Sequence, residues 1–211
     1  MIQNKTLGIF TRIPLYVLGE ALKDHLTGFD VTEEHLTQLL EADYAGWKTK
    51  HFAATHIISA VKNSPLTPFL EEHKTEILDA LNNNSDRSLI LTAVICGRYH
   101  FAYQLAKIFA KQFRQQDVIS TKLLHSLVAD IYGMNVSTKN TLNSVVPQMI
   151  EAGIIKRDKP GQFEPTEAIA PNHQVTIDLW KEAFFANEPL CDRDDEESYI
   201  FEPFFRYIKF V

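Results

Sequence analysis

The sequence predicts a mainly helical protein, in which an N-terminal helical bundle is followed by a winged helix-turn-helix. Apolar residues recur with a period near 3.6 along most of the 211 residues, which is the period of an amphipathic helix. Helix breakers are few, with 8 glycines and 9 prolines. The expected divisions are a bundle over residues 1–116, a winged helix-turn-helix over 117–170, and a C-terminal helix with an acidic, aromatic tail over 171–211.

The bundle is expected to begin with a helix over residues 13–26, where Pro14 stands near the start and its missing N–H costs nothing. Asp30 or Thr32 can cap a second helix, because both side chains accept a hydrogen bond from first-turn N–H groups. Two more helices are predicted over residues 48–62 and 66–81.

The next helix, around residues 89–96, has little polar face and is predicted to be the central helix of the bundle. After Gly97 the pattern becomes amphipathic, with apolar residues at Phe101, Leu105, Ile108, Phe109 and Phe113. A last helix is expected over residues 172–187, before the acidic run from Asp192 to Glu197.

Residues Ser120 to Glu164 carry the helix-turn-helix pattern. A first helix has the apolar positions Leu123, Leu124, Leu127, Val128 and Ile131. Gly133 suits the turn, because positive φ is easy for glycine, and Ser137 is expected to cap the second helix. The apolar stripe of that second helix is Leu142, Val145, Val146, Met149 and Ile150.

The opposite face of the second helix is polar, with Asn140, Asn143, Ser144, Pro147 and Gln148. A proline inside a helix costs on the order of 3 kcal/mol and bends the axis, so Pro147 predicts a kink. Ile154 and Ile155 then begin a hairpin with a turn at residues 159–162.

Asparagine and serine side chains can contact base edges or phosphates, and basic side chains on a wing can contact phosphates. The candidate DNA-binding residues are Ser137, Thr138, Lys139, Asn140, Asn143, Lys156, Arg157 and Lys159. The alternative for these residues is a solvated helix face and an ordinary basic turn.

Charge is distributed unevenly along the chain. The formal net charge is −6, which argues against general affinity for nucleic acids. Residues 111–160 nevertheless carry seven basic and four acidic side chains, a balance of +3, whereas residues 161–211 carry four basic and eleven acidic ones. The predicted winged helix therefore lies in the one net-positive block of the sequence.

The sequence contains no arrangement typical of an enzyme or a metal site. The eight histidines form no HExxH motif, and Cys96 and Cys191 are far apart, so neither a metal nor any other cofactor is expected. No nucleophile, base and orienting group occur in one region, which predicts a protein that is not an enzyme.

The location expected from the sequence is the cytoplasm. The N-terminus lacks a continuous apolar segment, and the longest apolar run, Leu89 to Cys96, is far shorter than the roughly 20 residues of a membrane span.

Four segments resemble the BrxA family of bacterial BREX phage-defence systems: TLGIFTRIPLYVLGEAL, the basic Lys48-Thr49-Lys50 with Ala53-Ala54, RSLILTAVICGRYHFAYQLAKIFAKQF, and VSTKNTLNSVVPQMIEAGII. The resemblance covers roughly residues 4–170 and leaves residues 188–211 without a counterpart. It implies a non-enzymatic DNA-binding protein, with an N-terminal domain similar to the NusB antitermination fold, that acts beside larger methyltransferase and phosphatase-like proteins.

The function expected is the binding of double-stranded DNA within a phage-defence system, possible partners being other proteins of that system. The alternative is a protein–protein adaptor, in which the winged helix is structural and the C-terminal tail docks a partner. In that case, deletion of residues 188–211 should abolish the interaction and leave the fold intact. A second alternative for the aromatic tail is packing against the helical core.

Overall fold

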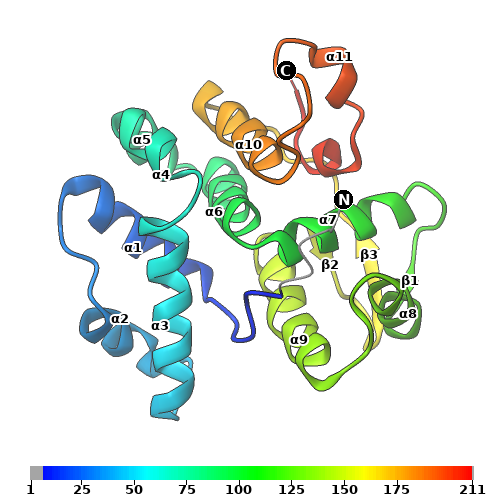
Figure 1. The fold of residues 1–211 in the computed structure, drawn as a ribbon, viewed down its shortest axis with the longest axis horizontal. Coiled ribbons are helices and arrows are strands. Elements are labelled where there is room, and N and C mark those ends of the chain that lie inside the picture. Colours follow the sequence, from blue (N-terminus) through cyan, green and yellow to red (C-terminus); the bar gives the residue numbers. More distant parts are fainter. Residues whose placement is uncertain (1–6, 211) are drawn as a thin grey trace.

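The computed structural model describes residues 7–210, apart from the side chain of Ser198. These residues are mainly helical, with one small sheet (Figure 1). The first elements are α1 (Leu15–Thr27), α2 (Glu33–Leu39), η1 (Leu40–Ala42), α3 (Trp47–Lys62), α4 (Thr67–Glu72), α5 (Lys74–Ala80) and α6 (Asn84–Arg98). The predicted helical bundle (residues 1–116) begins, and the predicted C-terminal division (171–211) ends, outside the described residues.

The second half contains α7 (His100–Gln112), β1 (Ile119–Ser120), α8 (Thr121–Tyr132), α9 (Val136–Glu151), β2 (Ile155–Lys156), β3 (Gln162–Pro165), α10 (Gln174–Asn187), α11 (Glu196–Tyr199) and η2 (Pro203–Tyr207). Figure 1 shows α1 to α5 on one side of α6, with α7 to α9 and the sheet on the other. In the described part of the chain, no helix is long and apolar enough to cross a membrane.

Helix α6 is central, as its apolar sequence predicted. It contacts α1, α3, α7 and α10, and residues Leu89 to Gly97 are all buried. Gly97 permits close packing here, because a Cβ at this position would lie 2.5 Å from Cδ1 of Leu66. The helix predicted over residues 66–81 is instead divided into α4 and α5 at His73, whose backbone leaves the helical region at φ −102° and ψ 25°.

The sheet has the strand order β1-β3-β2, and both pairs are antiparallel. Ile119 pairs with Phe163, and Lys156 pairs with Glu164. Helices α8 and α9 follow β1, and the β2–β3 hairpin closes through a turn in which the N–H of Gln162 donates to the carbonyl of Lys159. The turn predicted at residues 159–162 is thus confirmed.

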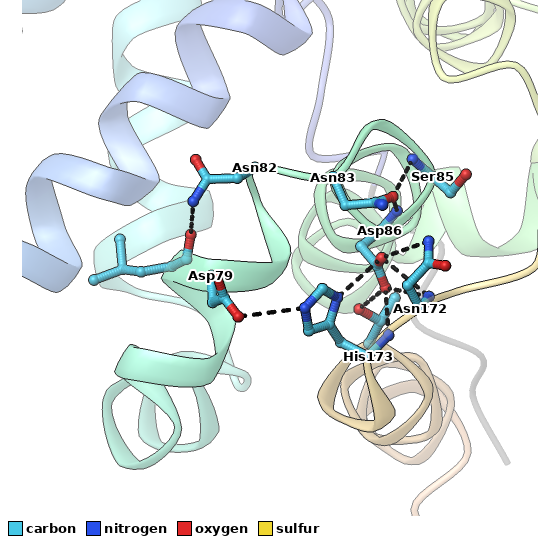
Figure 2. Close-up of polar contacts among 9 residues, drawn as sticks. Asp79, Asn82, Asn83, Ser85, Asp86, Asn172 and His173 are labelled. Carbon is cyan, nitrogen blue, oxygen red and sulfur yellow. Dashed lines mark hydrogen bonds and ion pairs between the residues drawn. The ribbon is translucent and has the colours of Figure 1, made fainter.

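Helix α10 is fixed to α6 by one buried carboxylate, Asp86 (Figure 2). Asp86 lies in the first turn of α6 and accepts hydrogen bonds from the backbone N–H groups of Asn172 and His173, at 3.0 to 3.2 Å. The Thr176 hydroxyl donates to the same carboxylate at 2.7 Å, and Nδ1 of His173 lies 3.1 Å from it. Asp86 thereby fixes the two residues just before α10, and the Thr176 side chain in its first turn, to the start of α6.

Two pKa shifts in this network give opposite pH dependences. Burial alone would raise the pKa of Asp86, but hydrogen bonds from Thr176, His173 and Asn172 outweigh burial and lower it below 3.8. The hydrogen bond to Asp86 raises the pKa of His173 above 6.5. By linkage, the contribution of Asp86 to folding stability is complete above pH 3.8. It is lost as the pH falls through the lowered pKa of Asp86. The contribution of His173 to folding stability is complete below pH 6.5. It is lost as the pH rises through the raised pKa of His173.

We therefore expect the wild-type protein to lose stability as the pH rises from about 6.5 through the raised pKa of His173, because His173 gives up its charge beside Asp86. His173→Gln removes the titrating group, so its urea midpoint should fall less over the same range. Urea unfolding at several pH values measures both. An equal fall in the two proteins would contradict the assigned role of His173.

The C-terminal tail packs into the core. This agrees with the interpretation that its aromatic residues cover the helical core. Phe204 is fully buried and stacks on Trp180, with ring centroids 4.7 Å apart. The Tyr207 hydroxyl donates to the carbonyl of Ala106 in α7, and a parallel bridge joins Ile169 to Ile208. The expectation that residues 188–211 can be removed without harm to the fold is therefore wrong, because these side chains fill the space beside α7.

The N-terminal helices are joined to α9 by Glu151. Its Oε1 accepts the backbone N–H of Leu15 at 2.9 Å, and its Oε2 lies 2.6 Å from the Arg12 guanidinium. The N-cap of α1 is Pro14, whose side chain has no oxygen to cap the helix, so a carboxylate from α9 does so instead. This contact fixes α9 against the rest of the molecule.

Candidate nucleic-acid interface

Helices α8 and α9 are set by local capping. The Ser120 hydroxyl accepts the N–H of Leu123 at the start of α8, and Gly133 ends that helix with φ +73°. The cap of α9 is Asn135, whose Oδ1 accepts the N–H of Thr138 at 2.9 Å. The predicted cap at Ser137 is wrong by two residues, because the tight turn after Gly133 brings Asn135 into the capping position.

The exposed face of α9 contains four of the five residues predicted for this helix: Ser137, Lys139, Asn140 and Asn143. Thr138 is different, since its side chain is fully buried and its hydroxyl donates to Oδ1 of Asn135. Thr138 therefore supports the cap of α9 and does not reach a ligand at the surface.

Two other residues assigned to the polar face, Ser144 and Gln148, are also buried. The Ser144 hydroxyl donates to the carbonyl of Asn140, four residues earlier in the same helix. The buried stripe of α9 is therefore wider than its apolar residues indicated. Helix α9 continues through Pro147 to Glu151.

The three basic residues predicted for the β2–β3 hairpin have different surroundings. Lys156 lies 3.2 Å from carboxylate oxygens of both Asp158 and Glu164. Hydrogen bonds to Glu164 and Asp158 raise its pKa, so it is charged but already paired. Arg157 lies over the ring of Phe163, 5.4 Å from its centroid, and Lys159 is exposed.

A hollow of about 200 Å³ is bordered by α8, α9 and the hairpin, and we call it the α8–α9 hollow. Its lining consists of Thr121, Leu124, His125, Leu142, Asn143, Val146, Pro147, Arg157 and Phe163. Asn143 of α9 and Arg157 of the hairpin, predicted separately from the sequence, thus border one concave surface.

The sequence prediction missed Thr121 and His125, which line the same hollow. They are four residues apart in α8, a spacing that places two side chains on one helix face, and this signal could have found them. Exposed Lys122 follows Thr121 and adds a cation to the start of α8.

Among residues 7–210, no group of three or more histidine, cysteine, aspartate or glutamate side chains is placed to hold a metal ion. Comparisons with protein-family models, with curated proteins and with solved structures find no match. The geometry of the α8–α9 region is therefore the basis for a functional assignment.

Proposed function

We propose that residues from α7 to β3 form a winged helix-turn-helix that binds duplex DNA. The order of elements supports the proposal, since a helix is followed by a strand, two helices and a hairpin, and the hairpin strand β3 pairs with β1. In such a module the second helix of the helix-turn-helix lies in the major groove, and here that helix is α9. The hairpin β2–β3 is then the wing.

The observation that carries the proposal is the position of Asn143 and Arg157 on one concave surface, beside the exposed polar face of α9. Asparagine can donate and accept at base edges, whereas arginine and lysine neutralise phosphate charge. A groove-bound α9 would place Asn140 and Asn143 near bases, and the wing would place Arg157 and Lys159 near the backbone.

Charge limits the strength of this binding. The whole chain has a net charge of −6, and Lys156 is already paired with two carboxylates. The phosphate contacts are therefore assigned to Lys139, Arg157 and Lys159, so that the affinity should fall steeply as salt rises.

The resemblance to the BrxA family supports a wider proposal. The wider proposal is that the protein acts in a bacterial phage-defence system in the cytoplasm, as a DNA-binding component with no enzymatic activity and no cofactor, beside other proteins of that system. The resemblance also supports a NusB-like arrangement for the N-terminal helices. The mainly helical fold is compatible with both statements.

The charge reversal Lys139→Glu tests the proposal. We expect it to weaken binding of a labelled duplex about tenfold or more at low salt, because it turns an attractive phosphate contact into a repulsive one. Fluorescence anisotropy gives the dissociation constants. Lys74→Glu is the matched control, since Lys74 is exposed on α5, far from α9 in Figure 1, and the change in net charge is the same.

Absence of wild-type binding at low salt would reject DNA binding by this protein. An equal loss in the Lys139 and Lys74 variants would reject α9 as the contact surface, because only net charge would then matter.

The adaptor alternative draws support from two exposed apolar side chains near the tail, Leu190 and Phe201, which are 82% and 79% exposed. Large exposed apolar side chains occur at partner-binding surfaces. Leu190→Ser with Phe201→Ser should then abolish capture of a defence-system partner while the fold is kept. Unchanged capture would count against the alternative.

A further inference from the structure

A cavity outside the α8–α9 region has a volume of about 440 Å³. It lies between the segment before α1, helix α3 and the junction of α6 with α7. Residues of α8, α9 or the hairpin do not line it, so it is separate from the proposed DNA interface. Its volume falls in the range of roughly 300 to 1,000 Å³ that is typical of small-molecule sites.

Aromatic rings form much of the cavity wall. Phe10 meets Phe52 edge to face, with centroids 4.9 Å apart, and meets His56 in the same way at 4.7 Å. His56 in turn lies edge to face with Tyr99. Burial, together with the nearby positive charge of Arg98, lowers the pKa of His56 to about 4, so this ring is neutral at pH 7. His56 and Tyr99 are nearly buried, whereas Phe10 is 47% exposed, so the wall presents mainly the uncharged ring of Phe10 to a planar group.

One fixed cation faces this wall. The Nε of Arg98 donates to the Ser59 hydroxyl at 2.8 Å, and the guanidinium lies 5.7 Å from the centroid of the Tyr99 ring. Within residues 7–210 Arg98 forms no ion pair, and the lining includes no carboxylate. The two terminal nitrogens of the guanidinium therefore remain available for an anion, in the fork geometry that arginine uses with phosphate.

The junction of α6 and α7 borders the cavity. This helix of 13 residues begins at His100, and its N-cap, Tyr99, makes no side-chain capping hydrogen bond. His100 and Tyr99 both line the cavity. Tyr99 is also the C-cap of α6, so the negative end of α6 and the positive end of α7 meet here, and Arg98 remains the main positive group of the cavity.

We propose that this cavity binds a mononucleotide, with its phosphate at the Arg98 guanidinium and its base against the aromatic wall. The juxtaposition of one unpaired arginine with Phe10, Phe52 and Tyr99 selects a ligand that carries both an anion and a planar ring. An anion alone would leave the aromatic wall unused, and a neutral ring alone would leave Arg98 unpaired. This proposal is independent of DNA binding at α9.

Isothermal titration calorimetry of the 211-residue chain tests it with 5′-AMP, GMP, CMP and UMP, and with adenosine and inorganic phosphate as separate ligands. We expect at least one mononucleotide to bind about tenfold or more tightly than adenosine and than phosphate, because only the mononucleotide engages both features. Arg98→Ala should weaken that binding by about tenfold or more.

Arg87→Ala is the matched control, since Arg87 lies on the same helix and outside the cavity lining, and it should bind as the wild type does. Phe10→Ala should weaken the mononucleotide and leave phosphate unchanged. The proposal is overturned if no mononucleotide binds with a dissociation constant below about 1 mM. It is equally overturned if no mononucleotide binds more tightly than adenosine does, or if the Arg98 variant binds as the wild type does.

Discussion

Asp86→Ala is expected to lower the free energy of unfolding by about 3 to 5 kcal/mol, the range observed when a buried, paired charge is lost. Asp86 is fully buried and accepts hydrogen bonds from Asn172, His173 and Thr176. Its removal leaves several donors at the start of α10 without an acceptor, and each such buried donor costs about 1 to 3 kcal/mol. Urea unfolding followed by circular dichroism measures the loss.

The matched control is Asp79→Ala, which removes a second carboxylate near the same histidine. The Asp79 side chain is 75% exposed and lies 3.4 Å from Nε2 of His173, so an effect below about 1 kcal/mol is expected. If the two variants lose equal stability, Asp86 does not hold α10 to α6.

Phe204→Ala is expected to cost about 3 to 5 kcal/mol, the usual range for a large aromatic side chain removed from a core. Phe204 has no exposed surface and packs against Trp180 and Tyr103, with ring centroids 4.7 and 4.8 Å away. The substitution leaves a void between α7, α10 and the tail. Thermal and urea unfolding measure the change.

Phe201→Ala makes the same chemical change three residues earlier in the tail. Its side chain is 79% exposed, so we expect an effect within about 0.5 kcal/mol. A Phe204→Ala loss as small as the one expected for Phe201→Ala would show that the tail is not part of the core.

Helices with long apolar stripes were predictable because periodicity is a local property of the sequence. The stripes from Phe101 to Phe113 and from Leu142 to Ile150 correspond to α7 and α9. The central position of α6 followed from the same reasoning, since a helix without a polar face must be covered on all sides. Of the candidate contacts, Lys139, Asn140 and Asn143 are exposed on α9, as their spacing indicated.

Contacts between distant residues were not predictable. The partners of Asp86 are 86 to 90 positions away, and no local pattern marks a buried aspartate at a helix start as the cap of another helix. The same holds for Glu151, which caps α1 from the end of α9. The pairing of Lys156 with Glu164 depends on the strand register, which is set by the hairpin as a whole.

The burial of Thr138 is a subtler failure. Its position inside the first turn of α9 made it a reasonable surface residue, but the cap begins two residues earlier than predicted. With Asn135 as the cap, the backbone N–H and the hydroxyl of Thr138 both donate to Oδ1 of Asn135. A short polar run such as residues 135–138 offers several capping residues, and tertiary packing selects among them.

The salt dependence of DNA binding tests the central claim most directly. The logarithm of the association constant should fall linearly with the logarithm of salt concentration, with a slope of roughly −0.9 for each phosphate contacted. The Arg157→Ala/Lys159→Ala double variant removes two proposed phosphate contacts, so its slope should be shallower than that of the wild type by about 1.8. An unchanged slope would contradict the assignment of the hairpin as a DNA-contacting wing.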